Sequence, residues 1–354
     1  MFRIFLIFNL LLTSLYAQEP ENPLIGKQST EVKDLTSNLT WMNRAFNEKL
    51  TSFKDFNGKV VVLEFSAVWC GPCIASIPHL IEIQTQLSPV GLRVISIFSP
   101  DNDPPLEGII KEFKINYDVA RDNKNELFTG YSIQSFPQVY VLNSTGKVAW
   151  HGHPMELDKG YLVELLLANI PIGSNEILKT AKKELIEGNI LAARTTLETA
   201  PPETALAADQ LSQFIQNLAK GTVASFPDFA QLSEMEKFAY AENYENLLVR
   251  FGEIDAFKSL KANVAALKKS ETYEFQKALY EQEKAEKEKQ AAMEEAAQAE
   301  WNNLVETMIL PAESAGETDF KKFIPQFKAF LEKYKGTQMA EQVENILRTR
   351  KILE

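Results

Sequence analysis

The sequence is poor in the residues that build disulfide frameworks and metal sites. It has two cysteines and three histidines among 354 residues. Two cysteines cannot form a disulfide framework or an all-cysteine zinc site, and a mixed cysteine–histidine site would use nearly all of these side chains. We therefore expect the two cysteines to act with each other, and we expect neither a metal nor another cofactor.

Acidic residues outnumber basic residues in the chain. The chain has 37 Lys and Arg against 48 Asp and Glu, which gives a net charge of −11. A nucleic-acid partner requires a basic face, so this balance argues against one. Hydrophobic residues make up 45% of the chain, which excludes disorder throughout and a multi-spanning membrane protein. The length predicts two domains, or one domain with a long appendage.

An apolar run lies near the N-terminus. Arg3 precedes a stretch of mostly apolar residues that ends at Ala17. This layout is typical of a signal peptide, residues 1–17, cleaved after Ala17. The alternative is an uncleaved membrane anchor, although spanning requires roughly 20 apolar residues and this run is shorter. We expect export to the periplasm or cell envelope, where a dithiol is oxidised unless a donor keeps it reduced.

Residues 18–170 alternate β-rich runs with helical segments. We expect strands at 59–65, 92–98, 138–142 and 147–150, and helices at about 71–88, at about 104–116, just after 122–125 and at 157–169. The strand at 59–65 is almost wholly apolar, as is typical of a strand that is buried on both faces. The turn residues 143–146 predict a hairpin between the last two strands. This order predicts an α/β domain.

Strand signals disappear after Pro171, so residues 171–354 are expected to form an all-α domain. Helices are predicted at 175–200 and 203–219, with breaks at Gly188-Asn189 and Pro201-Pro202. A long charged helix is predicted around 262–309, because residues 253–310 contain neither Gly nor Pro. Segments 247–256 and 330–340 resemble tetratricopeptide-type hairpins. An irregular helical bundle explains them equally well.

The strongest chemical signal is Cys70-Gly71-Pro72-Cys73, between an expected strand and an expected helix. Unpaired backbone N–H groups and the helix dipole stabilise a thiolate at a helix start, where Cys70 falls. Cys73, one turn later, is placed to attack a mixed disulfide, and Pro72 loses no helical hydrogen bond. If the two cysteines were half of a zinc site, two further ligands would be needed. A structural disulfide closing so small a loop would remove little chain entropy.

Residues 60–73 resemble the active-site signature of the thioredoxin family, and residues 24–170 resemble its exported TlpA/ResA-like branch. Pro78, Phe136-Pro137 and an insertion between the second and third strands support the resemblance. It implies a central mixed sheet flanked by helices, with Cys70 as the attacking thiolate and Cys73 as the resolving thiol. It also implies a cis Pro137 that places the backbone of Phe136 beside the sulfurs to pair with substrate. A trans proline that starts a strand also fits the spacing. Residues 171–354 share nothing with the family.

The resemblance gives two further residues a role. Glu64, within an apolar strand, matches the buried acid that takes the proton of the resolving cysteine, and Trp69 matches an exposed tryptophan beside the cysteines. A buried carboxylate must pair or take up a proton. The alternatives are a solvent-facing Glu64 on an edge strand and simple core packing for Trp69. The sequence departs from the family in having no lysine near this acid within 93–99, and in having Ser76 where a glutamate is common.

These patterns predict an enzyme, an exported thiol–disulfide oxidoreductase. The Gly71-Pro72 pair matches reducing members, so we expect reduction of protein disulfides and a membrane-linked electron donor. The alternative is a redox adaptor or disulfide isomerase whose helical half binds a dedicated partner or dimerises. Peroxidase chemistry is disfavoured, because a peroxide-reducing relative would carry its cysteine in a different strand-end context.

Overall fold

The computed structural model describes residues 22–35, 38–46, 50–101, 104–314, 320–350 and 352. The expected signal peptide, 1–17, and its cleavage point lie outside these residues. Within the described part of the chain, no helix combines the length and the apolar character that crossing a membrane requires.

A six-stranded mixed sheet forms the centre of the N-terminal part. Its strands are β1 (Leu39–Asn43), β2 (Val60–Ser66), β3 (Leu92–Phe98), β4 (Asp118–Asp122), β5 (Gln138–Leu142) and β6 (Val148–Gly152). Their order is β1-β4-β3-β2-β5-β6, with β2, β3 and β4 parallel and the other neighbours antiparallel. The four strands expected from apolar runs are confirmed. The strands β1 and β4 were not predicted, because β1 is a half-exposed edge strand and β4 begins and ends with aspartate.

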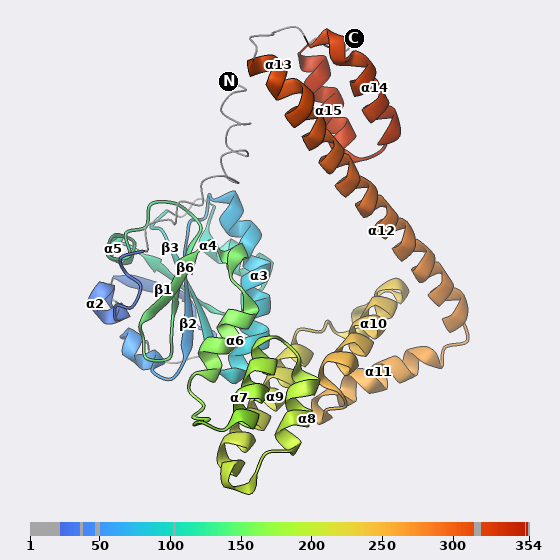
Figure 1. Cartoon of the computed structure of the whole chain (residues 1–354). Helices are drawn as coiled ribbons and strands as arrows, with labels where there is room; N and C mark the ends of the chain where they lie inside the picture. The colour runs from blue at the N-terminus through green and yellow to red at the C-terminus, as the bar shows by residue number, and fades with distance from the viewer. Residues whose placement is uncertain are drawn as a thin grey trace. The chain divides into compact units, whose positions relative to one another are not determined.

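Helices cover both faces of this sheet. They are α2 (Ser29–Lys33), α3 (Gly71–Leu87), α4 (Leu106–Phe113), α5 (Glu126–Gly130) and α6 (Lys159–Leu167). Figure 1 shows α3 and α6 on one side of the sheet and α2 and α5 on the other. Val61, Leu63 and Phe65 belong to the core cluster that includes Phe128 of α5. Because side chains alternate along a strand, Glu64 of β2 points to the opposite face, toward α3.

The described residues after 171 contain helices and no strand. The first five helices are α7 (Glu176–Ile186), α8 (Ile190–Glu198), α9 (Ala205–Ala224), α10 (Glu234–Phe251) and α11 (Lys258–Lys268). The predicted breaks at Gly188-Asn189 and Pro201-Pro202 are confirmed, because α7 ends before the first and α9 begins after the second. Segments 247–256 and 330–340 each contain a helix end followed by a left-handed glycine, Gly252 and Gly336. A helical repeat stays a prediction.

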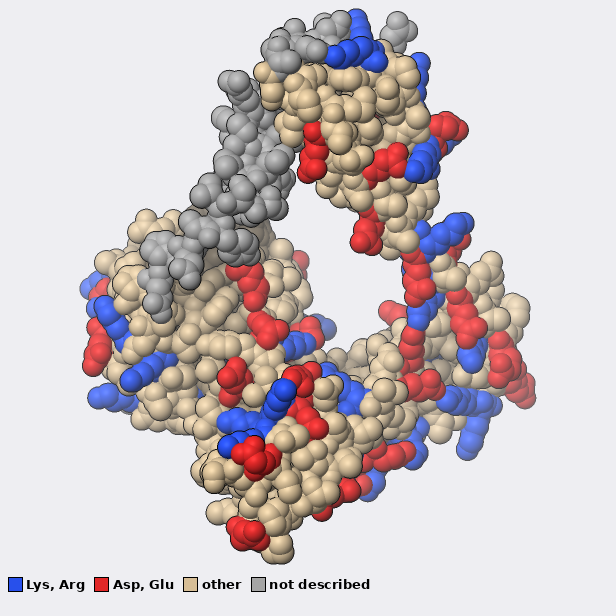
Figure 2. Space-filling model, viewed as in Figure 1, with Lys and Arg blue, Asp and Glu red and all other residues tan. Residues whose placement is uncertain are grey.

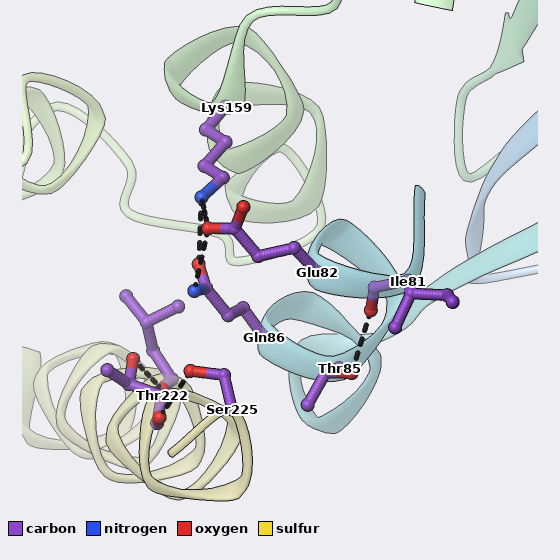
Figure 3. A network of polar contacts seen from close by, with 8 residues as sticks. Ile81, Glu82, Thr85, Gln86, Lys159, Thr222 and Ser225 are labelled. Carbon is purple, nitrogen blue, oxygen red and sulfur yellow. Dashed lines mark hydrogen bonds and ion pairs between the residues drawn. The ribbon is translucent and has the colours of Figure 1, made fainter. Parts of the chain in front are cut away.

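The chain divides into two compact units at a different point from the expected boundary at 170. One unit comprises residues up to Leu232 together with Tyr240–Ala265, and the other comprises Ser233–Ala239 together with residues from Ala266 on. The boundary at 170 falls inside the first unit, because α9 packs against α3. At this contact Gly221 of α9 lies against the backbone of Gln86. Figure 3 shows Thr222 of α9 and Ser225, the residue after this helix, near the end of α3 that carries Gln86.

The second unit is built around one long helix, α12 (Tyr273–Leu304). It continues through a π-helical turn (Val305–Ile309) into α13 (Leu310–Ser314), and α14 (Ile324–Lys333) and α15 (Gln338–Thr349) pack against it. The predicted helix around 262–309 is corrected: it is interrupted between α11 and α12, where the hydroxyls of Ser270 and Thr272 bond each other. Such side chains favour turns over helix interiors. Figure 2 shows acidic and basic residues interspersed along α12, which is mostly exposed and carries Lys–Glu ion pairs.

Candidate dithiol site

The two cysteines are joined by a disulfide at the start of α3. Cys70 is the N-cap of the helix, and its Sγ accepts a hydrogen bond from the backbone N–H of Cys73 at 3.2 Å. Pro72 lies in the first turn, where its missing N–H removes no helical bond. Cys70 is 5% exposed and Cys73 is fully buried, whereas Gly71 between them is exposed. The pair is therefore asymmetric, and Cys70 is the sulfur nearer to solvent.

Aromatic side chains surround the exposed side of the disulfide. The Phe136–Pro137 peptide bond is cis, as the resemblance implied, and Phe136 packs against the cluster of Ala67 and the two cysteines. The ring of Trp69 meets the edge of Phe136 at 5.8 Å between centroids and is 60% exposed. Core packing of Trp69 is thus excluded. This arrangement leaves an open apolar surface next to Cys70.

Asp101, in the loop after β3, holds the indole of Trp69. The Trp69 Nε1–H donates to Asp101 Oδ2 at 3.0 Å, and the Ser99 hydroxyl donates to the same oxygen at 3.1 Å. The Trp69 hydrogen bond is the main reason that the pKa of Asp101 is lowered. Sequence reasoning missed Asp101, because it lies 32 residues from Trp69 and only the fold brings them together.

Glu64 lies beneath the disulfide on the α3 face of the sheet. It is fully buried and stands on β2 between β3 and β5, so the alternative of a solvent-facing edge glutamate is wrong. Its carboxyl contacts two serine hydroxyls: Ser76 of α3 at 3.3 Å, and Ser96 of β3. Burial raises the pKa of Glu64 to about 7, and the two serine hydrogen bonds oppose this rise.

Ser96 connects Glu64 to a second buried titratable group. Ser96 is the partner of Glu64 in the parallel register of β2 and β3. Tyr117, just before β4, is also fully buried. Burial raises the pKa of Tyr117 well above its ordinary value, the charge of Glu64 adds to the rise, and a hydrogen bond with Ser96 opposes it. Neither Ser96 nor Tyr117 was predicted, although Ser96 is the one uncharged polar residue in the apolar run 92–98.

The structure thus brings all the residues expected at the site into one region. Cys70, Cys73, Gly71 and Pro72 open α3, Trp69 precedes them, Glu64 lies below them, and Phe136 and Pro137 flank them. Among the residues that the structure describes, no group of three or more His, Cys, Asp or Glu side chains is arranged to hold a metal ion.

The mixed sheet, the flanking helices and a Cys-Gly-Pro-Cys pair at the start of α3 define a thioredoxin-like fold with a dithiol site. Comparisons with known proteins agree: residues 31–151 match the model of the AhpC/TSA family. Over 100 residues the chain is 28% identical to the thiol-disulfide oxidoreductase ResA of Bacillus thuringiensis, and over 102 residues it is 24% identical to ResA of Bacillus subtilis. The chain is thus similar to proteins of the TlpA/ResA-like branch over this segment.

The similarity is confined to part of each protein. The matched segments are 28% and 29% of this chain and 58% and 57% of the two ResA proteins, so the chain spans little more than half of their length. Among solved structures, a putative thiol:disulfide interchange protein DsbE from Chlorobium tepidum aligns with 22% identity and a TM-score of 0.33. That alignment covers 41% of this chain and 96% of the other.

Proposed function

We propose that this chain is an exported enzyme that reduces disulfide bonds in proteins with the dithiol of Cys70 and Cys73. The observation that carries the proposal is the position of Cys70: its sulfur caps α3 and accepts an N–H bond from Cys73. In the reduced protein this N–H group and the helix dipole stabilise a Cys70 thiolate. A thiolate beside an open apolar surface is suited to attack a disulfide of another protein.

The proposed reaction consists of two successive thiol–disulfide exchanges. The Cys70 thiolate attacks one sulfur of the substrate disulfide, forming a mixed disulfide and releasing the other substrate sulfur as a thiolate. The Cys73 thiolate then attacks the Cys70 sulfur and releases the second substrate thiol. Two electrons pass from the dithiol to the substrate, and Cys70 and Cys73 end as the disulfide seen here.

Glu64 and the segment Phe136–Pro137 assist these exchanges. Glu64 takes the proton of the Cys73 thiol, because a carboxyl group whose pKa is about 7 is matched to proton transfer near neutral pH. Phe136 packs against the cysteines, and its backbone, as the family resemblance implies, pairs with an extended segment of the substrate. A membrane-linked electron donor then reduces the disulfide again.

Export is supported by the residues up to Ala17 in the sequence, which have the layout of a signal peptide. The second candidate function, a redox adaptor or isomerase, is favoured by the compactness of the unit formed by 233–239 and the residues from 266 on. Since both cysteines lie outside that unit, its contribution is to bind a dedicated partner or a second copy of the chain. Insulin reduction separates the two functions, because a general reductase keeps this activity when that unit is removed, whereas a dedicated adaptor or isomerase loses it.

The test is a trapping experiment with the mature chain. We expect Cys73→Ser to accumulate a mixed disulfide with insulin or with envelope proteins, because the second exchange is blocked. The control, Cys70→Ser, should trap nothing. After reduction at pH 7, iodoacetamide should modify Cys70 much faster than Cys73. Equal rates for the two thiols, or trapping by Cys70→Ser instead, would contradict the assignment.

A further inference from the structure

Ser76 of α3 and Ser96 of β3 both contact the buried carboxyl group of Glu64. The sequence has no lysine within 93–99, where thioredoxin itself places one near this acid, and it has Ser76 where a glutamate is common in the ResA-like branch. In their place, two hydroxyl groups contact opposite oxygens of the Glu64 carboxyl, Ser76 at Oε1 and Ser96 at Oε2. All three side chains are fully buried. A buried carboxyl group held only by neutral donors responds strongly to each of them.

The Ser76 hydroxyl has two hydrogen-bond acceptors within reach. Its Oγ lies 3.3 Å from Glu64 Oε1 and 2.8 Å from the carbonyl oxygen of Cys73. A hydroxyl group has one proton and therefore donates to only one of these acceptors at a time. When Glu64 is ionised, its oxygen competes for the Ser76 proton. When Glu64 is protonated, its own O–H can donate to Ser76, and Ser76 is then free to donate to Cys73.

We propose that Ser76 and Ser96 are positioning residues for Glu64, and that the Ser76 hydroxyl turns from Glu64 to the Cys73 carbonyl oxygen whenever Glu64 takes up a proton. Ser96 holds the other carboxyl oxygen in both states. The protonation of Glu64 is thereby linked to the first turn of α3, which carries both cysteines. The role of this linkage in disulfide exchange rests on the proposed function, whereas the linkage itself is independent of that function.

Other titratable groups near Glu64 must be separated from this effect. Tyr117 is fully buried just before β4, and its raised pKa keeps it neutral at the pH values concerned. On α3 the neighbouring titratable groups are the two cysteines, which do not titrate while they are joined as a disulfide, and His79, one turn after Ser76, whose pKa is lowered chiefly by burial. The opposing residue of β5 is Val139, which does not titrate. In the oxidised protein Glu64 is therefore the group that contacts Ser76 and titrates near neutral pH, and the variant Glu64→Gln separates its effect from that of His79.

The experiment uses the oxidised mature chain labelled with ¹³C at the cysteine carbonyl carbons. The sequence contains only two cysteines, so two signals result. We expect the Cys73 signal to shift between pH 5 and 9 with a midpoint near the pKa of Glu64, about 7. In Ser76→Ala this shift should be lost. Glu64→Gln should abolish it as well, and Ser76→Thr, which keeps the hydroxyl, should restore it.

Ser96 is tested through the same signal and through the rate of disulfide exchange. Ser96→Ala removes a hydrogen bond that stabilises the carboxylate, so the midpoint should rise by about one pH unit. Ser96→Thr should restore it. The pH profile of mixed-disulfide resolution should move by the same amount.

Ser66→Ala is the matched control. Ser66 is a buried serine on the same strand and the same face as Glu64, and its hydroxyl has no hydrogen-bond partner among the residues that the structure describes. It should leave the midpoint unchanged. A Cys73 signal that titrates equally in Ser76→Ala and Ser66→Ala would overturn the inference, as would an unchanged midpoint in Ser96→Ala. A chain that reduces no disulfide, yet shows these carbonyl shifts, would refute the proposed function and leave the inference intact.

Discussion

Glu64 makes the stability of the protein depend on pH. Its pKa in the folded chain is raised from 4.5 to about 7, chiefly by burial. The folded state therefore prefers the protonated form, so this contribution to stability is complete below pH 4.5 and is lost as the pH rises through 7.

We expect the free energy of unfolding of wild type to fall by about 2–3 kcal/mol between pH 5 and pH 8 because of this group. Glu64→Gln should remove that fall, so the variant becomes the more stable protein at pH 8. Urea denaturation at the two pH values measures the difference. Glu107→Gln, an exposed change on α4, should behave as wild type. A fall of the same size in Glu64→Gln would mean that another group is responsible.

At the scale of elements, the contact between α3 and α9 depends on the absence of a side chain at Gly221. A Cβ atom there would overlap the backbone carbonyl of Gln86, which cannot move aside without distorting α3. Next to this contact, Lys159 of α6 pairs with Glu82 and donates to Gln86, as Figure 3 shows. The end of α3 is thus held by two other helices.

Gly221→Ala should therefore destabilise the protein by about 1–3 kcal/mol, the usual effect of overpacking, although alanine is the better helix former. The control is Gly108→Ala on α4, where a Cβ atom meets nothing within 4 Å. That variant should be as stable as wild type or more stable by up to about 1 kcal/mol. The midpoints of urea denaturation compare the two. Equal midpoints would mean that α9 does not pack closely on α3 in solution.

Elements encoded by local patterns were predictable, and those defined by pairing were not. The apolar runs and the cysteine spacing identified β2, β3 and the start of α3. The interaction of Ser96 with Glu64 follows from the register between β2 and β3, which no local pattern specifies. The edge strand β1 lacks an apolar run because much of it is half-exposed. The attachment of α9 to α3 was missed because it joins segments more than a hundred residues apart.

For the whole molecule, this attachment changes what truncation should do. The sequence predicts that residues 171–354 can be removed without loss of dithiol chemistry. Ending the chain at residue 170 removes α9 and exposes the face of α3 that it covers. Ending it at residue 269 keeps the whole first unit.

We expect fragment 18–269 to reduce insulin within a few-fold of the mature chain. Fragment 18–170 should melt at a lower temperature, by more than about 4 °C, because apolar surface of α3 is left in water. Differential scanning calorimetry and the insulin assay on the same preparations test both statements. If 18–170 melts at the same temperature as 18–269, the helices up to α11 add no stability to the thioredoxin-like domain.

The cap of α15 in the second unit has a consequence for folding during synthesis. The start of α15 is capped by its own Thr337 and also by Glu294 of α12, whose carboxylate accepts the backbone N–H groups of Gln338 and Met339 at 2.7 and 2.6 Å. The cap for the last helix thus comes from a helix that leaves the ribosome more than forty residues earlier. Because α12 carries its own Lys–Glu pairs, it can form before its partners are synthesised. The nascent chain therefore presents α12 as a preformed surface to the later segment that forms α15.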